Sequence, residues 1–268
     1  MANNAIFFCE ILGCKKIILI HNNNIYIRNK IINQKYNMSI ELDNSKDFLF
    51  NKTINLSCLF FYYYYRYLKP ENRINIVKNE ILNNLPKIIT NSNDLYIHIR
   101  SGDIFNRTLK NSYSQPPFCF YKKILNNFNF RKVFIISQNK NNPVINKLIS
   151  EYSYIIYNQN LINIDISYLA NSYNIVSSVS SFIIGIIKLN DYLKYVWEYD
   201  IYKLTQKYFH LHYSVYNFEH NYTIYQMKPS QYYKRVMNIW QNSPKQKEIM
   251  INEKCKSNFK IIHPYLNI

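Results

Sequence analysis

The chain has 268 residues, of which 48% are hydrophobic, so it is long enough for a buried core and too apolar for wholesale disorder. Its formal net charge of +17 would suit a polyanionic partner. However, Lys, Asn, Ile and Tyr are abundant and only 3 glycines occur, which is the residue usage that A/T-rich codons give, so this charge alone does not lead us to expect a nucleic-acid partner.

The cysteines and histidines form no recognisable metal or disulfide pattern. The cysteines are odd in number and include no C-x-x-C pair, which argues against a zinc ribbon and gives no disulfide framework. His210 and His212 would share one face of a strand, but two histidines without a third ligand make a poor metal site. The five cysteines are Cys9, Cys14, Cys58, Cys119 and Cys255.

No targeting or membrane segment is recognisable. Glu10, Lys15 and Lys16 interrupt the apolar start, so no secretory signal is predicted. No apolar run is long enough to span a bilayer, and the longest candidate, Leu56–Leu68, carries Arg66. We expect no membrane span, and these observations alone leave a cytoplasmic location open.

The first 90 residues predict an N-terminal lobe. A short helix over 4–13 should precede a buried strand at Lys15–Ile20, with Gly13 at the C-terminal cap of the helix. Such helices normally follow a first strand, so we expect that this sequence lacks an N-terminal β-strand. The other elements predicted here are a strand at Ile25–Ile27 and helices at Leu56–Leu68 and Ile74–Leu85.

From about residue 91 to residue 204, strands and helices are predicted to alternate, which favours a parallel, doubly wound α/β sheet. We expect Asp165 to cap the third of these helices and Pro143 to lie in the first turn of the second. The predicted strands are Leu95–Arg100, Lys132–Ser137, Tyr154–Tyr157 and Ile175–Ser177. The predicted helices are Phe118–Leu125, Pro143–Tyr152, Ile166–Ser172 and Phe182–Leu189.

Residues 205–268 form a basic, Tyr- and Lys-rich segment. Tyr232, Tyr233, Lys234 and Arg235 mix aromatic and basic side chains, as proteins that bind single-stranded nucleic acids do. We interpret the segment instead as a helical tail that packs back on the preceding domain.

The candidate site begins at the end of the strand predicted at Leu95–Arg100. His98 and Arg100 interrupt its apolar run, and the alternation of a strand places both on the same face, where they could meet one ligand. Gly102 follows directly, and in a chain this poor in glycine it predicts unusual backbone geometry or a close approach. Taken singly, either polar residue would be an ordinary core or solvated side chain; the combination points to function.

Other polar residues fall where strands of a parallel sheet should end, which is where such sheets bind ligands. Ser137 and Gln138 follow one strand. Ser177 to Ser181 lie between a strand and a helix, where hydroxyl and N–H groups can bind an anion, although serines are also common helix caps.

Two segments resemble motifs of one enzyme superfamily. His98-Ile99-Arg100-Ser101-Gly102-Asp103 resembles the H-x-R-R-G-D motif of the α-1,2-, α-1,6- and protein O-fucosyltransferases, with Ser101 in place of the second arginine. The stretch from Asp165 to Phe182 is similar to a second motif, in which a helix led by Asp precedes a strand that ends in S-x-[ST]-F. The two motifs match in order and spacing across about residues 94–190.

The resemblance implies a GT-B-like fold of two Rossmann-like lobes, with GDP-fucose bound between them and inverting transfer that needs no metal or other cofactor. By position, Arg100 would contact the β-phosphate and stabilise the charge that develops on the departing GDP. His98 and Asp165 would contact the guanine. The diphosphate pocket would be lined by Ser180, Ser181 and Phe182.

Few residues are candidates for the general base and for the acceptor site. Asp103 is a candidate base, with the alternative that it only holds its loop by hydrogen bonds. In the loop rigidified by Pro116 and Pro117, we expect Tyr113 and Gln115 to face the acceptor.

The sequence thus predicts an α/β protein with an incomplete acceptor-side lobe at 1–90, a donor-nucleotide lobe at 91–204 and a basic tail at 205–268. The predicted activity is transfer of a sugar, with GDP-fucose as the expected donor, to a glycan or protein. Two alternatives stay open: an inactive relative that binds a sugar nucleotide, and a polyanion-binding protein with a steep salt dependence. Family analogy places such enzymes in the secretory pathway or Golgi.

Overall fold

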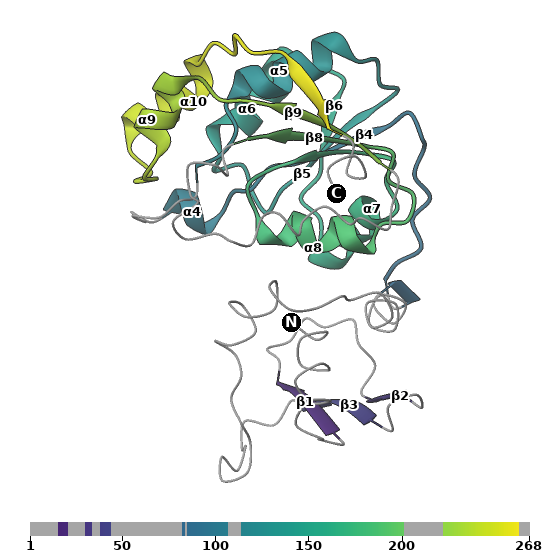
Figure 1. Ribbon diagram of the computed structural model, residues 1–268. Helices are drawn as coiled ribbons and strands as arrows, with labels where there is room; N and C mark the ends of the chain where they lie inside the picture. Colours follow the sequence, from purple (N-terminus) through teal and green to yellow (C-terminus); the bar gives the residue numbers. More distant parts are fainter. Residues whose placement is uncertain are drawn as a thin grey trace. The chain divides into compact units, whose positions relative to one another are not determined.

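The computed structural model describes residues 82–83, 85–106, 114–200 and 222–262, together with three strands nearer the N-terminus (Figure 1). The chain divides into two units, residues 1–86 and residues 87–268. The expected strand at Ile25–Ile27, the helices at 4–13 and 56–68 and most of the helix at 74–85 lie outside the described residues.

In the first unit the three described strands form one sheet. Strand β3 (Met38–Asp43) lies in the middle, parallel to β1 (Lys16–Ile20) and antiparallel to β2 (Lys30–Asn33). The strand predicted at Lys15–Ile20 agrees with β1 to within one residue at its start. The pattern of residues predicts neither β2 nor β3, because both lie in a mainly polar stretch of the chain.

A mixed seven-stranded sheet is the centre of the second unit, which confirms the α/β prediction. Its strand order is β6-β5-β4-β7-β8-β9-β10; all pairs are parallel except β9 with β10. The chain order therefore reverses between β4 and β7, as in doubly wound nucleotide-binding sheets. The strands are β4 (Leu95–His98), β5 (Val133–Ile136), β6 (Ile155–Tyr157), β7 (Asn174–Ser177), β8 (Tyr195–Tyr199), β9 (Thr223–Met227) and β10 (Phe259–Ile262).

Helices cover both faces of this sheet (Figure 1). On one face α10 (Pro244–Asn252) packs against α5 (Phe118–Asn127) and α6 (Pro143–Glu151). On the other, α7 (Ile162–Ala170) packs against α8 (Ser181–Leu189). The short helices α4 (Asp103–Asn106) and α9 (Gln231–Met237) complete the set among the described residues.

The start of α7 corrects one prediction. Asp165 is not the cap: the helix begins at Ile162, Leu161 occupies the N-cap position without a side-chain hydrogen bond, and Asp165 lies within the first turns. Asp is a preferred capping residue, but here the apolar residues before it extend the helix. Pro143, by contrast, lies in the first turn of α6 as predicted, behind the capping side chain of Asn142.

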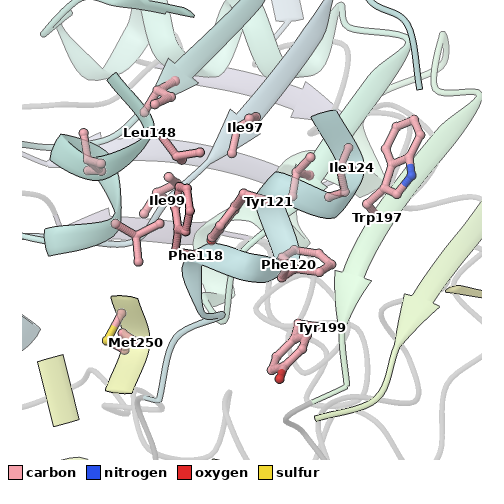
Figure 2. Packing of buried hydrophobic residues seen from close by; sticks show 14 of the residues in the cluster. Ile97, Ile99, Phe118, Phe120, Tyr121, Ile124, Leu148, Trp197, Tyr199 and Met250 are labelled. Atoms are coloured by element: carbon pink, nitrogen blue, oxygen red, sulfur yellow. The ribbon is translucent and has the colours of Figure 1, made fainter. Parts of the chain in front are cut away.

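Alternation in β4 divides its side chains between the two faces of the sheet. Leu95, Ile97 and Ile99 enter the main core, together with aromatic residues of α5 and β8. Figure 2 shows this core, where the side chains of α5 lie between Ile97 on β4 and Trp197 on β8. On the opposite face the Tyr96 ring stacks on Phe134, with ring centroids 5.0 Å apart. His98 follows Tyr96 by two residues and so belongs to this second face.

The C-terminal segment is part of the sheet and not only a helical tail. Strands β9 and β10 extend the sheet beyond β8, while α9 and α10 pack beside it. A disulfide joins Cys119 of α5 to Cys255, which follows α10, at a sequence separation of 136. The prediction that the cysteines form no disulfide framework is therefore wrong, because this pair is brought together only by the fold.

Candidate functional site

Two of the predicted site segments, the end of β4 and the serine turn after β7, meet at the point where the strand order reverses. The carboxyl ends of β4 and β7 are neighbours there, since the two strands pair in parallel. The loops after them run to opposite faces of the sheet, and doubly wound sheets bind their ligands at such a point. His98 ends β4, and Ser177 ends β7.

His98 is a buried titratable side chain at the end of β4. It is 6% exposed, its ring lies 5.2 Å from that of Phe182 in α8, and its Nδ1 lies 2.7 Å from the Ser178 hydroxyl. Burial, reinforced by the positive charge of Arg100, lowers the pKa of His98 to about 3, so the imidazole is neutral at pH 7. Its Nε2 makes no hydrogen bond with the described residues and can bind a ligand.

Arg100 lies two residues beyond His98 and is partly open to solvent. Its side chain is 22% exposed, and its Nη2 lies 3.6 Å from Oδ2 of Asp103, the first residue of α4. Its carbonyl oxygen accepts from the Asn142 side chain at 3.0 Å. The hydrogen bond from Asn142 thus holds the backbone at Arg100 in place. A guanidinium on such a backbone is well suited to recognise a phosphate.

Gly102 has both properties that the sequence predicted for it. Its φ is +71°, and a Cβ atom at this position would lie 2.0 Å from Oε1 of Gln138. The Asn139 side chain holds the same loop, because its Oδ1 accepts from the Gly102 N–H at 3.2 Å. Asn139 is a positioning residue that the sequence analysis missed, since one asparagine does not stand out in an Asn-rich chain.

Ser101 takes the place of the second arginine of the motif, and its side chain is turned into the protein. It is 3% exposed; its hydroxyl donates to Asn139 Oδ1 at 2.7 Å and accepts from the Asn142 N–H at 2.9 Å. Ser101 thus connects the loop after β4 to the loop after β5.

The serine turn after β7 leads into α8. Ser178 is fully buried and contacts His98, and Ser180 is the N-cap of α8, where its hydroxyl accepts from the Phe182 N–H at 3.2 Å. The side chain of Ser181 lies outside the described residues. The turn therefore connects the neutral histidine to the N-terminus of a helix, which favours anions.

Asp165 approaches the same edge of the sheet from α7, whose N-terminus follows β6. The carboxyl is 8% exposed, and its Oδ1 accepts from the Asn160 side chain at 3.0 Å. Burial raises the pKa of Asp165, and the hydrogen bond from Asn160 partly offsets this effect. A buried carboxylate with one such partner can accept further N–H groups from a ligand.

The two residues assigned to the acceptor have different outcomes. Tyr113 lies outside the described residues. Gln115 is fully buried, and its Nε2 donates to the Val179 carbonyl at 3.1 Å. Gln115 is therefore held inside the protein against the serine turn, and its expected contact with an acceptor stays a prediction.

Two acidic residues were missed at the carboxyl end of β8. Glu198 pairs in register with Ser177, and Glu198 and Asp200 are only 6% and 5% exposed. Gln226 of β9 donates a hydrogen bond to Glu198. In the stretch 195–200 every second residue is aromatic, and Val196, Glu198 and Asp200 alternate with these aromatic residues. This period of two is typical of a strand and could have revealed the two acidic residues.

The described part of the chain contains no cluster of three His, Cys, Asp or Glu side chains arranged to hold a metal ion. Among the same residues no helix is long and apolar enough to cross a membrane.

Comparisons of this chain with protein-family models, with curated proteins and with solved structures find no match.

Proposed function

We propose that this chain is a glycosyltransferase that binds a nucleoside diphosphate sugar at the carboxyl ends of β4 and β7, with GDP-fucose as the donor. The observation that carries the proposal is the buried hydrogen bond between His98 and Ser178 at the point where the strand order reverses. It ties together the two segments that resemble the fucosyltransferase motifs, although 80 residues separate them.

The chemistry of each group matches one part of such a donor. Neutral His98 and the buried carboxyl of Asp165 offer hydrogen bonds to a base, and a carboxylate is a natural acceptor for the N–H groups of guanine. Arg100 and the N-terminus of α8 offer positive charge to the diphosphate.

In the proposed reaction an acceptor hydroxyl oxygen attacks C1 of the sugar while the bond from C1 to the β-phosphate oxygen breaks. The electron pair of that bond passes to the diphosphate, where Arg100 would stabilise the added charge. The diphosphate would compete with Asp103 for the guanidinium, since the two side chains now lie 3.6 Å apart. The released carboxylate could then accept the hydroxyl proton, and the configuration at C1 would be inverted.

The environment of Ser101 supports a second candidate, an inactive relative that retains nucleotide binding. A clamp of two arginines is the pattern of the motif, and the second position here is a buried hydroxyl engaged with Asn139. This candidate makes the same prediction for donor binding and differs only in turnover.

Calorimetric titration with GDP, with UDP as the control and EDTA present, tests the proposal. We expect selective GDP binding that Arg100→Ala weakens at least tenfold, because a charge-assisted contact to phosphate is worth about 1.5–3 kcal/mol. Arg235→Ala is the matched control: it removes the same charge from an exposed side chain of α9, outside both motif segments. Equal losses in both variants would instead support the polyanion-binding alternative, and absent GDP binding by the folded wild type would refute the proposal.

A further inference from the structure

Gln115 connects the serine turn to the C-terminal segment through buried hydrogen bonds. Its side-chain Nε2 donates to the Val179 carbonyl at 3.1 Å, and its own carbonyl accepts from the Tyr233 hydroxyl. Gln115 and Tyr233 are both fully buried. The glutamine therefore has a fixed position, which α9 sets from one side and the turn after β7 from the other.

The hydrogen bond to Val179 fixes the direction of one peptide plane. The peptide between Val179 and Ser180 is trans, since no cis peptide bond occurs among the described residues. In a planar trans peptide the C=O and N–H groups point in opposite directions. Because the Val179 carbonyl is held toward Gln115, the N–H of Ser180 must point away from it.

That N–H is available to a ligand. No hydrogen bond within the described part of the chain uses the Ser180 N–H, and Ser180 itself is the N-cap of α8. A polar group at the end of β4 is in a similar state: His98, held by Ser178 of this turn, is 94% buried and keeps an Nε2 without a partner among those residues. The Ser180 N–H and the His98 Nε2 are therefore both available to a ligand at this end of the sheet.

We propose that Gln115 is a positioning residue of the diphosphate site, which orients the Val179–Ser180 peptide so that the Ser180 N–H donates to a diphosphate oxygen. This inference rests on the proposed function and deepens it. The hydrogen bond from Gln115 acts before any ligand arrives, so the donor needs no rearrangement when the anion binds. If the peptide turned over, the Val179 carbonyl would face the anion instead and repel it.

The test separates the contribution of the phosphates to the binding affinity from the contribution of the nucleoside. Gln115→Met keeps the length of the side chain and removes the donor. Affinities for GDP and for guanosine are measured by NMR titration for the wild type and the variant. We expect GDP binding to weaken about tenfold, as for the loss of a hydrogen bond to a charged group, while guanosine binding changes less than twofold.

Gln246→Met is the matched control, because Gln246 is also buried and its Nε2 also donates to backbone carbonyls, those of Val236 and Ile239. It should lower the melting temperature and leave the ratio of GDP to guanosine affinity unchanged. Tyr233→Phe, which keeps the ring and removes the bond to Gln115, covers the case that Gln115→Met does not fold, with an expected loss of about threefold for GDP.

The outcomes distinguish the two proposals. Wild-type protein that binds no GDP refutes the proposed function. Wild-type protein that binds GDP, together with a Gln115→Met or Tyr233→Phe variant that keeps its GDP affinity or loses GDP and guanosine affinity equally, overturns the positioning role alone.

Discussion

Protonation of His98 should destabilise this protein at mildly acidic pH. The unfolded chain binds a proton at His98 with a pKa of about 6.5, whereas burial and Arg100 lower the folded-state pKa to about 3. Between these values the unfolded state holds more protons, so stability falls as the pH drops, by about 1.4 kcal/mol per unit once the pH is well below 6.5. Integrated from pH 7 to pH 5, this single group removes about 2 kcal/mol of folding free energy.

Urea denaturation of wild type and of His98→Asn at pH 7 and pH 5 isolates this contribution. The asparagine can still contact the Ser178 hydroxyl but carries no titratable group, and the other histidines are common to both proteins. We expect the wild type to lose about 2 kcal/mol more than the variant over this interval. Equal losses in the two proteins, to within about 0.5 kcal/mol, would refute the conclusion that His98 is buried and neutral.

Three further variants test the loop after β4 and the anchor of the C-terminal segment. Gly102→Ala should cost about 1–2 kcal/mol in urea denaturation because of its positive φ, while the exposed Gln138 side chain can swing away; an unchanged midpoint would contradict this. Ser101→Arg, which restores the motif, should destabilise by about 3 kcal/mol through overpacking and the loss of two hydrogen bonds, and a variant of wild-type stability would show that the position is open. Replacing Cys119 and Cys255 with serine should cost about 2–5 kcal/mol and remove the sensitivity of the urea midpoint to dithiothreitol; a midpoint that never responds to the reductant argues against the disulfide.

The middle of the second unit could be predicted because its signals are local. Each strand from β4 to β7 is an apolar run bounded by polar or turn residues, and Pro143 marks the start of α6. His98 and Gly102 stood out for the same reason, since each breaks a local pattern.

The remaining features depend on contacts between distant residues. Strand β8 carries the acidic residue Glu198 within an aromatic run, so its sequence does not look like that of a buried strand. The hydrogen bond from Gln226 of β9, which accommodates Glu198 there, becomes visible only in the folded structure. Cys119 and Cys255 are 136 residues apart, and only the packing of α10 on α5 brings them together. Gln115 was assigned to a surface because its loop is rich in proline, whereas burial beneath Val179 is a tertiary property.

Hydrogen–deuterium exchange with and without GDP tests the central claim most directly, because it locates the ligand without knowledge of the acceptor. We expect GDP to slow exchange in the peptides that contain His98 to Asp103 and Ser178 to Phe182, with no change in α10 and β10. Protection confined to other segments, or no protection at GDP concentrations that saturate binding, would contradict a donor site at the carboxyl ends of β4 and β7.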